Sequence, residues 1–334
     1  MKVRLAVLLG DGAGIGPEQV AKCAAEGFLT EQCDPIILGD RRIWDRALQF
    51  TGNEGYEVVS IDNFDNLTFD GKRPLFYDMK DLDPADFEMG TVNAFTGKAS
   101  VDQLDLSVDL WKKGIVSAIL FAPFNKASMK ASKGEVYASE LAYLRDILDF
   151  HGYSCEINHM RHVFTTRATS HVPLTQIGKY ITKDVIQDSI RLLWKTMLDA
   201  GNKEPRIAIA ALNPHAGEYG TCGREEIDII APAVAEMNAE GIPCTGPISA
   251  DTLFNRAFNL GEFDGIVTMY HDQGQIALKL LGFEEGVSIQ GGLPCPITTP
   301  AHGSAFEIAG TGTCSIRAFK TALLDAVAMG GNRG

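Results

Sequence analysis

Polar side chains follow four apolar runs of the sequence, at the points where buried strands would end. Histidine and carboxylate side chains in such positions can bind metals or transfer protons. In open α/β sheets, ligands bind beyond the carboxyl ends of the strands, so these side chains are expected to share one site. The segments are Asp11 after 3–9, Lys126 after 115–121, Asn213 to His215 after 206–211, and His271 with Asp272 after 265–270.

Apolar runs of strand length alternate along the chain with longer amphipathic segments. One of these segments, 184–200, has apolar residues at helical spacing. Pro17 and Glu18 are typical of the first turn of another helix. The alternation predicts an α/β fold with a largely parallel sheet. No linker rich in Pro, Gly or Ser marks a domain boundary.

The composition is that of a globular protein with an acidic balance. The chain has 334 residues, 45% of them apolar and 22% charged, which predicts two domains or one large one. Its 30 basic and 43 acidic side chains give a formal charge of −13, which argues against nucleic acid or a membrane surface as partner. The 7 cysteines form no CxxC pair, so a reducing cytoplasm is expected. We expect neither a targeting segment nor a membrane span.

Two histidines are distinguished by their neighbours. His271 precedes Asp272, and ligating histidines commonly have their second nitrogen held by a carboxylate. His215 follows Asn213 and Pro214, and the proline restricts Asn213 to an extended conformation that presents the histidine in a loop. At both positions, an ordinary surface-loop histidine is the alternative.

Two glycine-containing segments could approach a cofactor. The segment 10–18 is a Gly-rich turn between a predicted strand and a predicted helix, where a phosphate could approach the backbone. Its spacing is GxGxG rather than GxGxxG, so a purely structural turn is an equal alternative. In the segment 300–312, small residues around His302 would let a flat group such as adenine lie against the backbone.

Together these motifs resemble the 4-hydroxythreonine-4-phosphate dehydrogenase family of pyridoxal phosphate biosynthesis. The segment 302–310 is also similar to the adenine-side loop of isopropylmalate dehydrogenases, whose fold this family shares. The resemblance implies a two-domain α/β/α fold of the isocitrate/isopropylmalate dehydrogenase type. A cofactor-side domain would comprise 1–130 plus 275–334, and a metal and dimerisation domain would comprise 131–274. The matching segments, in the family's order, are 10–18, 122–126, 213–226, 250–254, 270–279 and 302–303.

The resemblance implies a metal centre and a nicotinamide cofactor, NAD or NADP. The family binds a divalent metal through three histidines, one from the partner subunit of a homodimer, and they correspond here to His171, His215 and His271. Nitrogen ligands favour zinc, then cobalt or nickel, and leave manganese and magnesium open. Such a metal would polarise the substrate hydroxyl while hydride passes to the nicotinamide, and a β-keto acid product would lose CO2. The implied cofactor-binding residues are Gly12, Gly14, His302, Gly303, Ser304, Ala305, Ile308 and Gly310.

The remaining catalytic and substrate residues follow from the same resemblance. Lys279 is expected as a cation beside the substrate, and Asp251 and Asp272 as partners of the metal-bound histidines. The implied substrate contacts are Lys126, Asn213, Ser288 and Ile297.

Several substrate positions depart from the family's pattern. The family's Gly-His-Thr-Glu motif is replaced in 137–144 by a segment without histidine. Ser288 stands where the family has asparagine, Ile297 where it has arginine, and Ala301 where it has aspartate. Because isoleucine cannot clamp an anion as arginine does, we expect part of the pocket to be apolar.

The metal and cofactor elements are thus kept while the substrate elements change. This predicts an NAD-dependent, metal-dependent dehydrogenase, with or without decarboxylation, acting on a small anionic hydroxy acid or a cis-dihydrodiol carboxylate. One alternative is an authentic 4-hydroxythreonine-4-phosphate dehydrogenase. Alternatives from other classes are a phosphate acyltransferase, which shares the fold, and a non-catalytic binder. Retention of all three histidines argues against both.

Overall fold

The computed structural model describes residues 2–134, 139–282 and 284–332. The chain divides into two compact units. Unit 1 comprises Met1–His151, Glu284–Ser288 and Leu293–Gly334, and unit 2 comprises Gly152–Phe283 and Ile289–Gly292. The strand β11 (Val287–Gly291) therefore contributes residues to both units.

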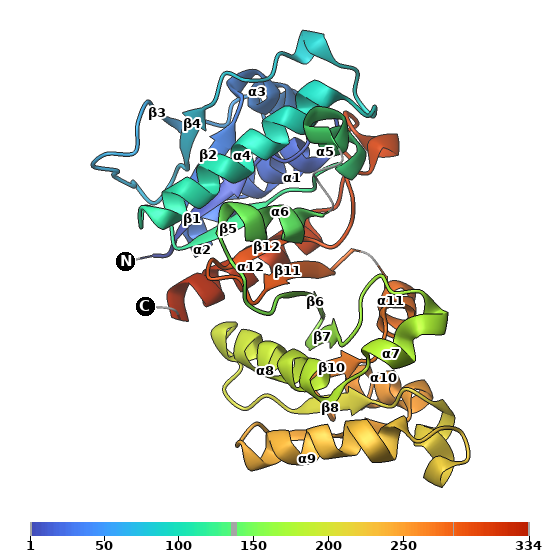
Figure 1. Cartoon of the computed structure of the whole chain (residues 1–334). Helices are drawn as coiled ribbons and strands as arrows, with labels where there is room; N and C mark the ends of the chain where they lie inside the picture. The colour runs from blue at the N-terminus through green and yellow to red at the C-terminus, as the bar shows by residue number, and fades with distance from the viewer. Residues whose placement is uncertain (1, 135–138, 283, 333–334) are drawn as a thin grey trace. The chain divides into compact units, whose positions relative to one another are not determined.

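Unit 1 is built on a parallel sheet (Figure 1). Its strands are β1 (Arg4–Leu8), β2 (Asp34–Gly39), β3 (Val59–Ile61), β4 (Leu75–Asp78), β5 (Ala118–Phe121) and β12 (Ile297–Pro300). They lie in the order β3-β4-β2-β1-β5-β12. The helices are α1 (Gly16–Ala25), α2 (Phe28–Gln32), α3 (Arg41–Phe50), α4 (Ala94–Lys112), α5 (Lys126–Lys133), α6 (Glu140–Ile147) and α12 (Arg317–Asn332), with short turns η1 (Pro84–Asp86) and η6 (Phe306–Ile308).

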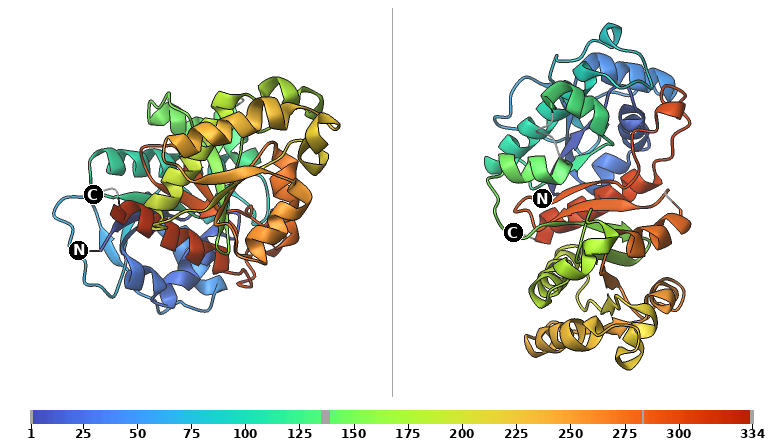
Figure 2. Two further views of the ribbon diagram at one scale, coloured as in Figure 1. Left: turned by 90° about the horizontal axis from the view of Figure 1, so that it is seen from below. Right: turned by 45° about the vertical axis from the view of Figure 1, so that its right-hand side comes forward.

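Helices cover both faces of this sheet, as Figure 2 also shows. Ala6 and Leu8 of β1 pack in one apolar cluster with Leu104 and Val108 of α4. Because side chains alternate along a strand, Leu5 points to the other face, where it is equally buried. Burial on both faces explains why the strands appear in the sequence as unbroken apolar runs.

Side-chain caps determine where several helices of unit 1 begin. Asp40, Asn93, Asn125 and Ser139 precede α3, α4, α5 and α6, and each accepts a hydrogen bond from a backbone N–H of the first turn. Such a cap stabilises a helix by about 1 kcal/mol.

Unit 2 has a mixed sheet in the order β6-β7-β10-β8-β9. Its strands are β6 (Cys155–Met160), β7 (Val163–Arg167), β8 (Ile207–Ala210), β9 (Cys244–Ile248) and β10 (Gly265–Thr268). Only the β6–β7 pairing is antiparallel among the pairings described within this unit. The helices are α7 (Ile177–Tyr180), α8 (Lys183–Asp199), α9 (Ala231–Ala239), α10 (Ala250–Phe258) and α11 (His271–Leu280), with η3 (Leu174–Gln176), η4 (Pro214–Gly220) and the π-turn η5 (Glu226–Ile230).

The α10 and α11 face of this sheet carries a second apolar cluster, in which Ala208 and Ile266 of the strands meet Leu253 and Leu278 of the helices. On the other side, a side chain at Gly265 would meet the sulfur of Met197 at 2.7 Å, so the glycine lets α8 approach β10.

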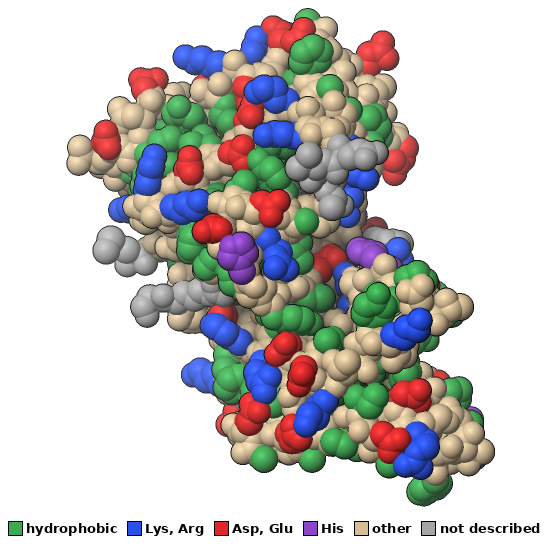
Figure 3. Space-filling view, in the orientation of Figure 1, with side chains coloured by type: hydrophobic (Ala, Val, Ile, Leu, Met, Phe, Trp, Pro, Cys, Tyr) green, Lys and Arg blue, Asp and Glu red, His purple; other side chains and the backbone are tan. Residues whose placement is uncertain are grey.

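The predicted α/β class is confirmed. The four apolar runs contain β1, β5, β8 and β10, and the segment 184–200 coincides with α8 to within one residue at each end. Within the described ranges, the chain has no helix of the length and apolar character needed to cross a bilayer. Acidic and basic side chains are intermixed on the face drawn in Figure 3.

Candidate active site

Unit 2 contains an open pocket of about 410 Å³ at the carboxyl ends of β7 and β10. These strands are parallel neighbours, so the segments that follow them lie side by side. His171 lies four residues beyond β7, and His271 begins α11, three residues beyond β10. Their ring centroids are 5.5 Å apart. The described residues that line the pocket are Thr169, His171, Val172, Leu174, Ile177, Tyr270, His271 and Asp272.

His271 is oriented by its neighbour. Its Nδ1 lies 2.7 Å from Oδ1 of Asp272, and 35% of its side chain is exposed. When Nδ1–H donates to the carboxylate, the lone pair of Nε2 is available to a metal or a proton. The structure therefore shows the contact between the His271 ring and the Asp272 carboxylate that their adjacency in the sequence suggests.

His171 adopts a left-handed backbone conformation, with φ at +53°. For a residue with a Cβ this costs roughly 1–2 kcal/mol, and such strain is held by its surroundings. The preceding Thr169 supplies part of that support, because its N–H and its hydroxyl both donate to the carbonyl oxygen of Met269, at 3.1 and 2.8 Å.

His215 lies in η4, where residues 215–219 all have positive φ. The loop is anchored by Glu226, which is 2% exposed. Oε1 of Glu226 accepts the N–H groups of Leu212 and Asn213 at 2.8 and 2.7 Å. The Asn213 amide donates to Glu226 at 3.0 Å and to Glu225 at 2.6 Å, so both of its N–H groups are already used within the loop.

His215 does not line the pocket that holds His171 and His271. Among the residues that the structure describes, no group of three His, Cys, Asp or Glu side chains is arranged to hold a metal. The structure thus brings together two of the three predicted ligands in one chain.

The predicted catalytic residues are placed differently. Asp272 lines the pocket beside His271. Asp251, in the first turn of α10, is exposed and accepts a hydrogen bond of 2.7 Å from the Ser249 hydroxyl; it is not among the lining residues. Lys279 is exposed on α11, eight residues beyond His271.

The predicted cofactor segments converge within unit 1. The Ile15 N–H donates to the carbonyl oxygen of Ser304 at 3.0 Å, and the Asn125 amide donates to the Ser304 hydroxyl at 3.1 Å. Glu18, which is buried, accepts the N–H groups of Gly310 and Gly312, each at 2.7 Å. The Gly-rich turn, the start of α5 and the segment 302–312 therefore form one structural cluster.

The glycines of this turn are explained by internal packing. A Cβ at Gly12 would lie 2.6 Å from Cδ2 of Leu82, and one at Gly14 would lie 2.7 Å from Cβ of Ser304. The hollow beside the turn has about 10 Å³ of free space, room for about one water molecule. The structural alternative for this motif is thus supported, and a phosphate role for Gly12 and Gly14 stays a prediction.

His302 is held in a neutral arrangement. Its Nδ1 is 2.9 Å from the Gly303 carbonyl oxygen, and its Nε2 is 3.1 Å from the amide nitrogen of Gln19. An imidazole that donates through Nδ1 and accepts at Nε2 fits both neighbours. Burial lowers the pKa of His302, in keeping with this neutral form. Beside it, a Cβ at Gly303 would meet no atom within 4 Å, so this backbone is open to a flat group.

Three of the predicted substrate residues, Lys126, Ser288 and Ile297, belong to unit 1 and are described within that unit. Lys126 begins α5, and its ammonium lies 3.5 Å from the Glu140 carboxylate. Ser288 is buried in β11, and Ile297 is fully buried in the apolar core of unit 1. Of the altered motif in 137–144, Tyr137 and Ala138 lie outside the described residues.

Two buried residues that hold the histidine-bearing segments were given no role by sequence reasoning. Arg167 ends β7, and only 5% of its side chain is exposed. Glu226 anchors the His215 loop. The available signal for Arg167 was a charged residue at the end of the β-branched and aromatic segment 163–166, but such residues usually mark exposed strand ends.

Comparison with known proteins identifies the class and then the family. The α/β fold is shared with a solved terephthalate 1,2-cis-dihydrodiol dehydrogenase from Burkholderia xenovorans, whose match covers 98% of each chain with a TM-score of 0.68 at 23% identity. The sequence matches the family described as "Pyridoxal phosphate biosynthetic protein PdxA" over residues 31–326. The chain belongs to this PdxA family.

Individual relatives agree with this assignment. A Pseudomonas aeruginosa protein named "Putative 4-hydroxythreonine-4-phosphate dehydrogenase 2" is 40% identical over 328 residues, 98% of this chain and 97% of its own. A Clostridium botulinum protein named "Putative D-threonate 4-phosphate dehydrogenase" is 35% identical over 314 residues, 93% of this chain and 92% of its own. The crystal structure of a Klebsiella pneumoniae 4-hydroxythreonine-4-phosphate dehydrogenase has a TM-score of 0.84 at 34% identity and covers 98% of this chain and 99% of its own. The protein is a dehydrogenase acting on a CH–OH group.

Proposed function

We propose that this protein is an NAD-dependent and divalent-metal-dependent dehydrogenase of a small anionic hydroxy acid. The observation that supports it best is the pair of imidazoles, His171 and His271, in one pocket at the carboxyl ends of two parallel strands. This is the position at which α/β sheets bind their ligands.

The spacing of the two rings suits a shared metal ion. With a metal–nitrogen bond of about 2.1 Å, the centre of a ligating imidazole lies about 3.2 Å from the metal, and two such rings at a tetrahedral angle have centres about 5 Å apart. The separation of 5.5 Å between His171 and His271 is close to this value. Two nitrogen ligands favour zinc, cobalt or nickel over magnesium or manganese.

We propose that His215 supplies the third ligand from the partner subunit of a homodimer. Within one chain His215 is exposed and does not line the pocket. Tyr219 of the same loop is fully exposed, which is the expected state of a single chain whose loop a second chain covers.

The chain's own residues then have distinct roles. Asp272 keeps the Nε2 lone pair of His271 available, and Val172, Leu174 and Ile177 provide apolar surface along the pocket. When bound, the metal polarises the substrate hydroxyl and NAD accepts the hydride. The segment around Gly303 would hold the adenine side of the cofactor, because its backbone is open.

The substrate class follows from what the pocket lacks and from the relatives' names. None of the described lining residues is Lys or Arg, and the family's arginine position is taken by a core residue, Ile297. We therefore assign the substrate's anionic groups to the metal and to an exposed cation of unit 2 such as Lys279. A hydroxy acid such as D-threonate 4-phosphate is the first substrate to test, with a cis-dihydrodiol carboxylate second. We place the reaction in the cytoplasm, where NAD is available.

The deciding assay follows NAD and NADP reduction by chelator-treated protein after reloading with single metals. Three substrates are compared: D-threonate 4-phosphate, 4-hydroxythreonine 4-phosphate and terephthalate cis-dihydrodiol. We expect metal-dependent turnover of the first or third to exceed that of 4-hydroxythreonine 4-phosphate. Robust turnover of 4-hydroxythreonine 4-phosphate instead would establish the authentic activity of that name.

A matched pair of variants tests the site itself. His271→Ala should abolish metal-dependent turnover and leave the fold intact. His151→Ala serves as the control, because 88% of the His151 side chain is exposed and it belongs to unit 1. Full activity of the His271 variant would refute the assigned site.

A further inference from the structure

We propose that Arg167 is a positioning residue that sets the separation of His171 and His271. The inference rests on the proposed function, because it assigns a role toward the same pair of histidines. It concerns how unit 2 holds two side chains that come from different strand ends.

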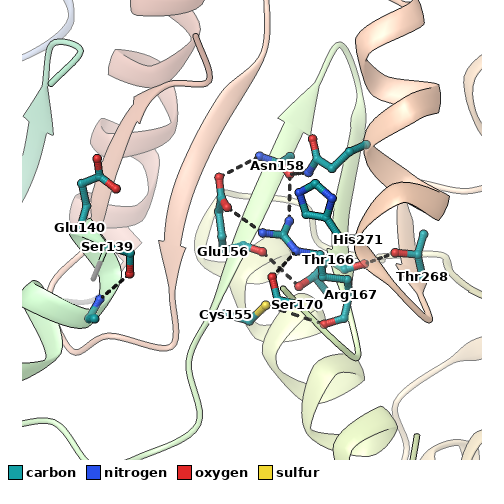
Figure 4. Close-up of polar contacts among 12 residues, drawn as sticks. Ser139, Glu140, Cys155, Glu156, Asn158, Thr166, Arg167, Ser170, Thr268 and His271 are labelled. Carbon is teal, nitrogen blue, oxygen red and sulfur yellow. Dashed lines mark hydrogen bonds and ion pairs between the residues drawn. The ribbon is translucent and has the colours of Figure 1, made fainter. Parts of the chain in front are cut away.

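The Arg167 guanidinium is buried and contacts three side chains (Figure 4). Its Nη2 donates to the Glu156 carboxylate at 2.7 Å, and its Nε donates to the Ser170 hydroxyl at 2.9 Å. Its Nη1 lies 3.4 Å from the side-chain oxygen Oδ1 of Asn158. Planar guanidinium groups suit such divergent contacts because their donors are fixed in one plane.

One of these contacts leads directly to His171. Ser170 is its neighbour in the chain, and its hydroxyl is held by Arg167. His171 has the unfavourable φ of +53°, so its backbone must be held from outside. The Arg167–Ser170 bond restrains the loop immediately before the strained residue.

Another contact leads to His271. The side-chain oxygen of Asn158, Oδ1, which faces Arg167, also accepts a hydrogen bond of 2.6 Å from the side-chain amide of Gln275. Gln275 lies on α11 one turn beyond His271, and residues four apart share one face of a helix. The chain of contacts from Arg167 through Asn158 and Gln275 therefore restrains the helix that begins with His271.

Stability alone is a poor account of this arrangement. Arginine is almost never this buried unless it is paired, and apolar residues of the same size often replace a buried ion pair without loss of stability. The buried guanidinium contributes what an apolar side chain cannot, namely a directed bond to the segment that carries His171 and, through Asn158 and Gln275, a link to the helix that carries His271.

The test uses Arg167→Met in the full-length protein, with Arg191→Met as the matched control. Arg191 pairs with Glu240 through both its Nε and its Nη2, but it lies on the exposed side of α8 and is 40% exposed. Binding of CoCl₂ and ZnCl₂ to the chelator-treated proteins is measured by calorimetry and by the cobalt absorption spectrum. We expect Arg167→Met to weaken metal binding about 10- to 100-fold and Arg191→Met to leave it unchanged. Arg167→Lys, which keeps the charge but not the fork, should recover only part of the loss.

Imidazole NMR resonances of the metal-free proteins provide a readout that needs no metal. Ser170→Ala should shift the His171 resonances and spare those of His271, whereas Gln275→Ala should do the reverse. These two milder variants keep the proposal falsifiable if the Arg167 variants do not fold. Unchanged resonances in both, or wild-type metal affinity in Arg167→Met, would overturn the inference. Failure of the wild-type protein to bind any metal would instead overturn the metal part of the proposed function, and the NMR readout would still decide the role of Arg167.

Discussion

Asp81 offers a sharp test of the electrostatics of unit 1. It follows β4 and lies near Asp40, Asp102 and Lys98. Both of its carboxylate oxygens are buried, and neither has a hydrogen-bond partner among the residues that the structure describes. Burial, followed by repulsion from Asp102 and Asp40, raises the pKa of Asp81 from 3.8 to about 6. The neutral Asp81→Asn variant removes this ionisation and nearly keeps the shape.

The sign and size of the effect follow from the raised pKa of Asp81. The folded protein binds the Asp81 proton more tightly than the unfolded chain does. The stability that this proton contributes is therefore fully present below pH 3.8 and is lost as the pH rises through about 6. A shift of about two pKa units corresponds to about 3 kcal/mol. We therefore expect Asp81→Asn to raise the free energy of unfolding by up to about 3 kcal/mol at pH 8 and by almost nothing near pH 4.

Urea unfolding of the full-length protein with and without Asp81→Asn, in a background that keeps only the buried Trp44 of the three tryptophans, measures this difference at both pH values through the fluorescence of Trp44 in unit 1. Asp86→Asn is the control, since Asp86 is exposed and its replacement should change neither curve. Equal shifts for Asp81→Asn at pH 4 and pH 8, or destabilisation at pH 8, would refute the reasoning.

Three further predictions concern the Gly-rich turn, the His215 loop and the pocket of His171 and His271. Gly14→Ala places a Cβ 2.8 Å from the Ser304 carbonyl oxygen, and because backbone yields little, it should cost about 1–3 kcal/mol in urea unfolding; unaltered stability would mean that the loops separate easily. Glu226→Ala leaves the N–H groups before His215 without their acceptor, so it should destabilise unit 2 by about 2–4 kcal/mol, with Glu226→Gln losing less; equal losses would point to charge rather than hydrogen bonding. Zinc at about 100 times its dissociation constant should stabilise the wild type by about 2.7 kcal/mol in thermal melts but not His271→Ala; an equal rise in both would place the metal elsewhere.

The central strands, and the polar residues directly after them, could be predicted reliably from the sequence. β1, β5, β8 and β10 are buried on both faces, so each appears as an unbroken apolar run. The pairing of His271 with Asp272 was equally accessible, because it depends on adjacent residues.

The features that could not be predicted depend on residues far apart in the chain. Gly14 needs to be glycine because of Ser304, which no local pattern connects to it. Ile297 is expected from the sequence to make part of a pocket apolar, and the structure places it at the start of β12, fully buried in the apolar core of unit 1. Arg167 has the pattern of an exposed strand end, and its burial depends on β6, whose Glu156 and Asn158 contact its guanidinium. Local periodicity reports which face is buried, not which distant side chain fills the space.

The left-handed backbone at His171 and at 215–219 has a consequence for how this protein responds to substitution. In a saturation library scored separately for abundance and for activity, most harmful substitutions should lower abundance and activity together. At His171, glycine and asparagine suit the backbone better than histidine does, so these variants should be as abundant as the parent, or more so, yet inactive. At His271, which is helical, the alanine variant should be the one that is abundant yet inactive. The two histidines of one pocket would thus leave different signatures in such data, one determined by a positive φ and the other by helix propensity.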